Sequence, residues 1–164
     1  MKIVVLSDTH GDAAIIPDVI AAHPDAAYYF HCGDSELAYE DVHIKDCKRV
    51  RGNCDYDVNY PLEEVVDVEG KTVFMTHGHL VNVNTTLTPL AMRAQEVGAN
   101  IVLFGHSHVL GAELVDGTLF LNPGSLKSPR GRKEKSYAVI ETTADSYSVT
   151  FLDDQHQLIT KINF

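Results

Sequence analysis

The sequence predicts an α/β protein with a four-layer sandwich, in which two mixed β-sheets pack face to face and helices flank them. Short β-branched runs alternate with helical patterns in the first two thirds of the chain, and strand patterns dominate the rest. With 164 residues, 45% of them hydrophobic, the chain is long enough for one domain with a proper core and too short for two ordinary ones. Residues 1–164 are therefore expected to form a single domain.

The first strands and helix follow from the N-terminal pattern. Residues 2–6 are continuously apolar after Lys2, which predicts a buried strand. Residues 13–22 predict a helix, and Pro17 must lie in its first turn or interrupt it. Further strands are expected at residues 27–30 and around Arg49 and Val50. This β-α-β alternation indicates a parallel core.

The remaining elements are joined by clear turn signals. Glu69-Gly70-Lys71 predicts a hairpin between strands at residues 63–68 and 72–76. The best helical pattern covers residues 86–97 and ends at Gly98. Asp116-Gly117 is a second hairpin signal, and the last three strand patterns predict a meander. The later strands are expected at residues 101–104, 110–115, 118–121, 137–141, 147–152 and 158–162.

Composition excludes several classes of partner. A net charge of −10 argues against broad electrostatic binding of nucleic acid or anionic lipid, because both need basic patches. The N-terminal apolar stretch stops at Ser7, well short of a signal-peptide core or a membrane span. Three cysteines without a C-x-x-C spacing fit a reducing cytoplasm. The three cysteines are Cys32, Cys47 and Cys54. We therefore expect a cytoplasmic protein without a membrane partner.

Residues of metal-ligand type follow five of the expected strands. Side chains just past the carboxyl ends of parallel strands converge on one crevice, where α/β proteins bind ligands. A lone histidine or aspartate there is more often a turn former, but five such positions together indicate a site. The candidate ligands are Asp8, His10, Asp34, Asn53, His77, His106 and His108.

Carboxylate, imidazole and amide donors suit Mn²⁺, Fe, Zn²⁺ or Ni²⁺ better than Ca²⁺. Seven ligands are too many for one ion that keeps a position open, but they suit two ions that share one carboxylate. Two ions about 3.5 to 4 Å apart can hold a bridging hydroxide and bind a phosphoryl oxygen at the same time. Such a centre would also supply the positive charge that the composition lacks.

The ligand motifs D-x-H, G-D, G-N, T-H-G-H and G-H-S-H resemble, in order and spacing, those of the calcineurin-like metallophosphoesterases. The small size, G-N-C-D at 52–55 and N-P-G-S at 122–125 are similar to the compact bacterial and archaeal phosphodiesterases of that superfamily. The resemblance runs from residue 8 to residue 130. It implies a small phosphodiester substrate and in-line attack by a hydroxide that bridges two divalent ions. Mn²⁺ is the foremost candidate for these ions, and Mg²⁺ is a further one. A homo-oligomer is an open alternative to a monomer. It further implies that one ion is held by Asp8, His10, Asp34 and His108, and the other by Asp34, Asn53, His77 and His106.

Cys54 is the departure from the family pattern. The resemblance implies a histidine that protonates the leaving oxygen after Asn53, and Cys54 stands in its place. A thiol, with a pKa of about 8.5, can donate a proton, but we favour a small buried bystander. His79 is a second candidate, for contact with substrate phosphate or as an ordered turn residue. The general acid is therefore unassigned.

Other polar residues have simpler interpretations. His31 is expected to be buried and hydrogen-bonded, and three further histidines, His23, His43 and His156, are expected at the surface. The one basic cluster is interpreted as a solvated loop, with Arg130 as a weaker candidate for phosphate contact. That cluster contains Lys127, Arg130, Arg132, Lys133 and Lys135.

Two functions from different classes fit the sequence. The first is a two-metal phosphodiesterase, and the alternative is a catalytically silent interaction scaffold with the same fold. Retention of all seven ligand positions favours the enzyme. A nuclease is disfavoured because the chain has no extended basic track for a polynucleotide.

Overall fold

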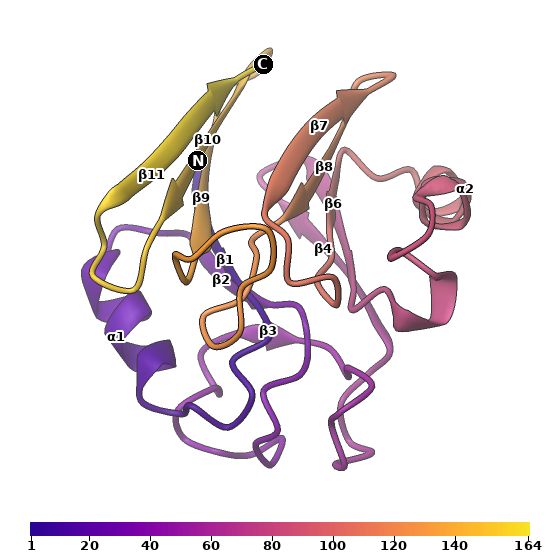
Figure 1. The fold of residues 1–164 in the computed structure, drawn as a ribbon. Coiled ribbons are helices and arrows are strands. Elements are labelled where there is room, and N and C mark those ends of the chain that lie inside the picture. The colour runs from indigo at the N-terminus through magenta and orange to yellow at the C-terminus, as the bar shows by residue number, and fades with distance from the viewer.

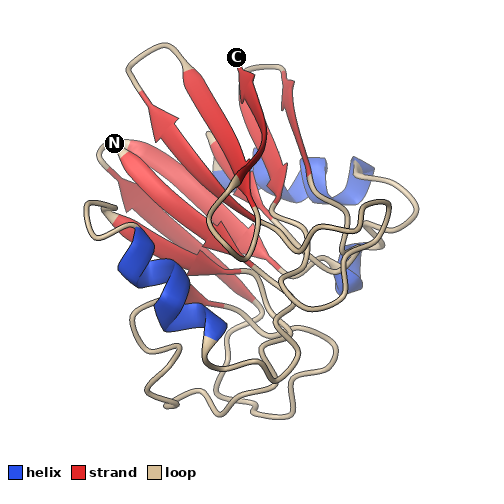
Figure 2. Ribbon diagram, turned by 60° about the vertical axis from the view of Figure 1, so that its left-hand side comes forward, coloured by secondary structure: helices blue, strands red, loops and turns tan.

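A computed structural model describes residues 1–164 and shows two mixed β-sheets packed face to face (Figures 1 and 2). The first sheet has the strand order β11-β10-β9-β1-β2-β3, and the second has the order β4-β5-β6-β8-β7. The first sheet contains β1 (Lys2–Leu6), β2 (Tyr28–His31), β3 (Lys48–Arg49), β9 (Tyr137–Thr142), β10 (Tyr147–Leu152) and β11 (Leu158–Asn163). The second contains β4 (Glu63–Val68), β5 (Lys71–Thr76), β6 (Ile101–Leu103), β7 (Gly111–Val115) and β8 (Thr118–Asn122).

One helix covers the outer face of each sheet, which gives the four predicted layers (Figure 1). Helix α1 (Ile15–Ala22) buries Ile16 and Val19 against the first sheet. Helix α2 (Thr88–Val97) buries Leu90 and Ala94 against Phe74 of the second sheet. The largest core cluster, 17 buried residues, fills the space between the two sheets. The predicted α/β sandwich is therefore confirmed.

The parallel strands place their carboxyl ends at one edge of each sheet. Strands β1, β2 and β3 pair in parallel, and so do β5, β6 and β8. The predicted meander is present, because β9, β10 and β11 pair antiparallel in sequence order. Both predicted hairpins, β4–β5 and β7–β8, are also present. The loops that carry the candidate ligands therefore start from neighbouring strand ends.

Several predicted boundaries differ by one or two residues. Helix α1 begins at Ile15, and the Asp12 carboxylate accepts its backbone N–H at 3.4 Å. Helix α2 begins at Thr88, because the Thr86 hydroxyl accepts the Thr88 N–H at 3.2 Å and Pro89 occupies the first turn. A short 3₁₀ helix, η1 (His79–Val81), was not predicted. None of the helices has the length and apolar character needed to cross a membrane.

Candidate metal centre

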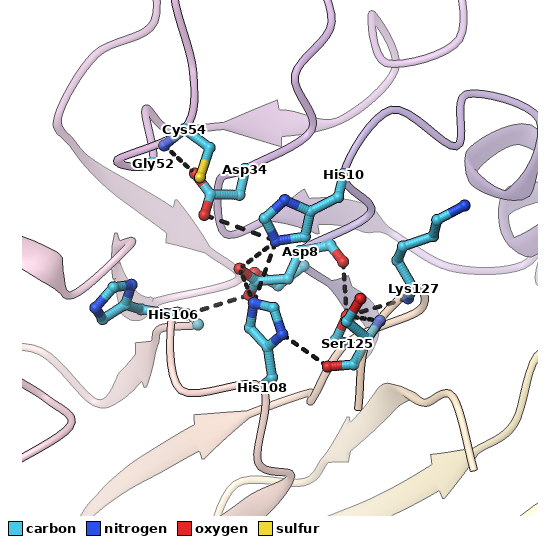
Figure 3. A network of polar contacts seen from close by, with 12 residues as sticks. Asp8, His10, Asp34, Gly52, Cys54, His106, His108, Ser125 and Lys127 are labelled. Atoms are coloured by element: carbon cyan, nitrogen blue, oxygen red, sulfur yellow. Dashed lines mark hydrogen bonds and ion pairs between the residues drawn. The ribbon is translucent and has the colours of Figure 1, made fainter. Parts of the chain in front are cut away.

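The seven candidate ligands lie together at the carboxyl ends of β1, β2, β3, β5 and β6. Figure 3 shows Asp8, His10, Asp34, His106 and His108 among them. Ligand atoms of Asp8, His10 and His108 lie within 4.8 Å of one another, and so do those of Asp8, Asp34 and His77. The Asn53 amide oxygen lies 3.1 Å from the ring nitrogens of both His77 and His106. Five loops that are distant in sequence thus form one polar cluster.

Asp8 lies at the centre of this cluster and is fully buried. Its Oδ2 accepts the Ser7 hydroxyl at 2.6 Å and the His106 backbone N–H at 3.1 Å. Its Oδ1 is buried without a hydrogen-bond partner, and the His108 Nε2 lies 3.2 Å from it. Burial opposes ionisation of Asp8, but the neighbouring imidazoles of His10 and His108 outweigh it and hold the pKa of Asp8 well below its usual range. A buried, ionised and unpaired carboxylate oxygen is suited to bind a cation.

Three of the imidazoles point a lone pair into the same space. The Nδ1 atoms of His10, His77 and His108 lie 2.7 to 2.9 Å from acceptor-only oxygens, so each Nδ1 carries the ring proton. Their Nε2 atoms are then acceptors, and those of His10 and His108 face each other at 3.2 Å. The neighbouring Asp8 carboxylate raises the pKa of His10 to about 9, which shows how strongly this space favours positive charge. The acceptors converge as metal ligands do, and their outer Nδ1–H groups are fixed as metal-bound histidines require.

The other half of the cluster uses the second carboxylate. The Asp34 Oδ2 lies 3.2 Å from the His77 Nε2 and 3.9 Å from the His10 Nε2, so it faces both halves. Its other oxygen, Oδ1, accepts the Cys54 backbone N–H at 2.8 Å. Burial opposes ionisation of Asp34, but His77 and this N–H outweigh it and lower its pKa. Donor separations near 3.2 Å are those of ligands that share an ion at about 2.0 to 2.2 Å.

Unusual backbone geometry holds the ligands in place. Five of the ten non-glycine residues with positive φ are candidate ligands, a conformation that costs free energy and concentrates at functional sites. The glycines before Asn53 and His106 are required by close packing. A Cβ on Gly52 would overlap the Asp34 carboxylate, and one on Gly105 would lie 2.6 Å from the Asp8 Oδ2. The candidate ligands with positive φ are Asp8, His10, Asp34, His106 and His108.

Asp55 is an important residue that the sequence analysis left unassigned. Its carboxylate is 5% exposed and accepts backbone N–H groups of Asp34 at 2.8 Å, Glu36 at 2.8 Å and Gly52 at 2.6 Å. It therefore ties the loop after β2 to the loop after β3. The spacing from Gly52 to Asp55 was the available signal, because aspartate often accepts backbone N–H groups near turns.

His31 is buried and hydrogen-bonded, as predicted. Its Nδ1 accepts the Gly33 backbone N–H at 3.2 Å, so its Nε2–H donates to the Thr9 hydroxyl at 2.9 Å. Burial lowers the pKa of His31 to about 4, which keeps the ring neutral. His31 thereby holds Thr9, which lies between two candidate ligands.

Cys54 corrects one interpretation, because it is exposed rather than buried. It lies in the turn after β3, and its sulfur groups with ligand atoms of His10 and Asp34 within 4.8 Å. Partial desolvation of the sulfur and the carboxylates of Asp34 and Glu36 raise the pKa of the thiol to about 11, so it is protonated at neutral pH. Cys54 therefore lies beside the candidate ligands, but its side chain is shorter than that of the histidine it replaces.

The remaining histidines are His79, which lies near the candidate ligands, and three that were expected at the surface, His23, His43 and His156. His79 packs near His77, with ring centroids 5.4 Å apart, and its Nδ1 is buried without a partner. The side chain of His43 is exposed, as expected, and its Nδ1 lies 2.7 Å from the Asp41 carboxylate. His23 and His156 were expected at the surface, but both are half-buried and hydrogen-bond the buried Tyr137 hydroxyl, at 2.7 and 2.8 Å. The tertiary fold brings them to Tyr137 from distant parts of the chain.

The structure is a two-sheet α/β sandwich with carboxylate, imidazole and amide groups at its strand ends, a set of donors that suits divalent metal ions. Comparison with known proteins makes the assignment specific. The family model for the calcineurin-like phosphoesterase superfamily domain matches residues 1–145. The chain therefore belongs to the calcineurin-like phosphoesterase superfamily, whose members use divalent metals.

Individual relatives agree with this assignment. The chain is 35% identical over 154 residues to the probable metallophosphoesterase YsnB of Bacillus subtilis, a match that covers 93% of this chain and 91% of that protein. It is 32% identical over 115 residues to the phosphodiesterase YfcE of Escherichia coli, covering 65% of this chain and 57% of YfcE. The crystal structure of a conserved uncharacterized protein of Streptococcus pneumoniae, a predicted phosphoesterase, has a TM-score of 0.96 and 36% identity, and the match covers 99% of this chain and 96% of that one.

Proposed function

We propose that the chain is a phosphodiesterase that holds two divalent metal ions at the candidate metal centre. The observation that carries this proposal is the cluster of acceptor atoms around the unpaired Oδ1 of Asp8. Asp34 would be shared by the two ions, because its Oδ2 faces both halves of the cluster. The first ion is assigned to Asp8, His10, Asp34 and His108, and the second to Asp34, Asn53, His77 and His106.

Mn²⁺ is the proposed metal, with Fe, Ni²⁺, Zn²⁺ and Mg²⁺ as alternatives, because the donors are oxygen and imidazole nitrogen and the exposed thiol is not required. Two such ions lower the pKa of bound water and neutralise the charge of phosphoryl oxygens. The chain's own residues supply position. Glu36 and the Ser128 carbonyl orient the rings of His10 and His108, and Asp55 holds the loop of Asp34.

Cys54 sets the expected preference for leaving groups. The reaction breaks a P–O bond, and the departing oxygen needs a proton unless it is stable as an anion. The thiol beside the ligands is protonated, but its short side chain reaches less far than an imidazole. Esters with acidic leaving groups, such as aryl diesters, should therefore react fastest. The phosphodiesterase YfcE, a relative of this chain, supports the choice of diesters.

The scaffold alternative requires that the cluster has no catalytic use. The structure keeps all seven side chains together, and five of them adopt costly positive φ angles that a scaffold would not need. A hydrolysis assay separates the two functions. Mn²⁺-loaded protein should hydrolyse bis(p-nitrophenyl) phosphate faster than p-nitrophenyl phosphate, and a cyclic nucleotide tests a natural type of diester.

Two variants control this assay. His106→Ala removes a proposed ligand and should abolish most activity, whereas His43→Ala makes the same change at a residue whose side chain contacts Asp41. Absence of turnover for all three substrates, with two ions bound per chain, would contradict the enzyme and favour the scaffold. Equal loss in both variants would contradict the assignment of the site.

A further inference from the structure

The loop between β8 and β9 carries a concentration of positive charge that the proposed chemistry does not use. Residues 126–135, here called the basic loop, hold five of the chain's 13 lysine and arginine residues but only one of its 23 carboxylates, Glu134. The rest of the chain is strongly acidic. The five cationic residues are Lys127, Arg130, Arg132, Lys133 and Lys135.

The basic loop is attached directly to the candidate metal centre. His108 Nδ1 donates to the Ser128 carbonyl at 2.7 Å, and the Arg130 backbone N–H donates to the His108 carbonyl at 2.9 Å. At the start of the loop, Ser125 donates to the Asp8 carbonyl at 2.7 Å and accepts the Ser128 N–H at 2.8 Å. Figure 3 shows Ser125 beside Asp8 and His108, with the Lys127 side chain leaving the loop next to Ser125 and extending outward. The backbone of the basic loop is therefore attached to the candidate ligands, and its base is fixed beside them.

The five cationic side chains have no anionic partner within the chain. Ion pairs of lysine and arginine in this structure are confined to Lys2, Lys45 and Arg93. Lys135 is half-buried, and the other four cationic residues of the basic loop are exposed. Five positive charges within ten residues repel one another. The chain has 23 carboxylates, but none of them forms an ion pair with these five side chains. Unpaired cations beside a phosphoester site are suited to bind a further anion.

The size of the basic loop limits what it can bind. A polynucleotide requires a track of positive charge along several nucleotides, and the cations here are confined to one loop of an acidic chain. The hydrogen bonds from the base of the loop to His108 and Asp8 fix the loop beside the candidate metal centre. The remaining occupant is a small anion attached to the substrate itself.

We propose that the basic loop binds a second phosphate group of the substrate, so that the preferred substrates are small phosphodiesters that carry an additional phosphate. This inference rests on the proposed phosphodiesterase function. The diester bound at the metal centre reacts, and the additional phosphate is held by the lysine and arginine side chains of the loop. Binding of this kind lowers KM and weakens as salt screens the charges.

Two substrates with the same reacting bond provide the test. They are the p-nitrophenyl ester of thymidine 5′-phosphate and the same ester with an added 3′-phosphate. At low salt, the wild type should have a kcat/KM about tenfold higher for the second ester, the gain expected from several exposed charge contacts. Arg130→Gln combined with Lys133→Gln removes two of the five cations and should remove most of this ratio. The backbone N–H of residue 130 still donates to the His108 carbonyl, so the loop should keep its position in this variant. Lys71→Gln combined with Lys161→Gln is the matched control and should keep the ratio.

Several results would overturn the inference. A wild-type ratio near one, or a ratio that the loop variant does not change, excludes a second phosphate site on the loop. Stronger competition by an oligothymidylate than by thymidine 3′,5′-bisphosphate would indicate a polynucleotide track instead. Failure to hydrolyse either ester with two ions bound would instead contradict the proposed function. Calorimetric binding of thymidine 3′,5′-bisphosphate and thymidine 5′-phosphate would then test the inference without turnover. Wild type should bind the bisphosphate about tenfold more tightly than the monophosphate, and the loop variant should bind the two with equal affinity.

Discussion

Asp55→Asn tests how the loop of Asp34 is held in place. The Asp55 carboxylate accepts three backbone N–H groups, whereas a carboxamide has only one acceptor oxygen. With that oxygen at the Oδ2 position, the bonds from Asp34 and Gly52 remain, and the new NH₂ group faces the Glu36 N–H. The lost bond to a charged group is worth about 1.5 to 3 kcal/mol. Burial raises the pKa of Asp55, so removal of the buried charge recovers part of the lost stability. We therefore expect the free energy of unfolding to fall by about 2 kcal/mol.

The displaced loop should also weaken metal binding, because residues that orient ligands typically contribute about 10- to 100-fold in affinity. Urea unfolding of the metal-free protein gives the first quantity, and calorimetric titration with Mn²⁺ gives the second. Asp57→Asn is the matched control, since Asp57 accepts N–H groups of Tyr39 and Asn59 in the same two loops but none from Asp34. Wild-type Mn²⁺ affinity in Asp55→Asn would refute the assigned role of Asp55.

Three further predictions address separate parts of the centre. Cys54→Ala, with metals bound, should hydrolyse an activated aryl phosphodiester within about tenfold of wild type, a barrier change of about 1.4 kcal/mol, and a thousandfold loss would make the thiol a catalytic acid. Gly105→Ala should lower Mn²⁺ affinity about a hundredfold by displacing Asp8, whereas Gly111→Ala, with open space at its Cβ, should not; equal affinities in the two variants would contradict the packing argument. Because the pKa of His31 is about 4 when folded and about 6.5 when unfolded, the unfolded chain binds more protons between these pH values, and wild type loses stability as pH falls through that window. Its stability advantage over His31→Gln should shrink by about 3 kcal/mol from pH 7 to pH 4, and parallel stability curves would contradict this.

Features set by local sequence were predictable. The strands and hairpins followed from alternating or continuous apolar patterns and from turn residues such as Asp116-Gly117, and the structure confirms them. The seven candidate ligands could be selected because ligand-type residues follow five strand patterns and the parallel strands end at common edges. Their assignment as metal ligands stays a prediction.

Features that depend on tertiary contacts were not predictable. The positive φ of His10 and the buried carboxylate of Asp55 depend on loops that meet only in the folded chain. The exposure of Cys54 depends on how its turn is held by Asp34, so a free cysteine was wrongly expected to be buried. Likewise, His23 and His156 lie 133 positions apart and meet only at the Tyr137 hydroxyl.

The number of Mn²⁺ ions bound per chain tests the account most directly. Titration of the metal-free protein, followed by elemental analysis after removal of free metal, should give two ions for the wild type. Asn53→Ala, which removes a proposed ligand of the second ion alone, should retain one ion at concentrations where the wild type holds two. A wild type that binds one ion or none under saturating Mn²⁺ would contradict the proposed two-metal centre.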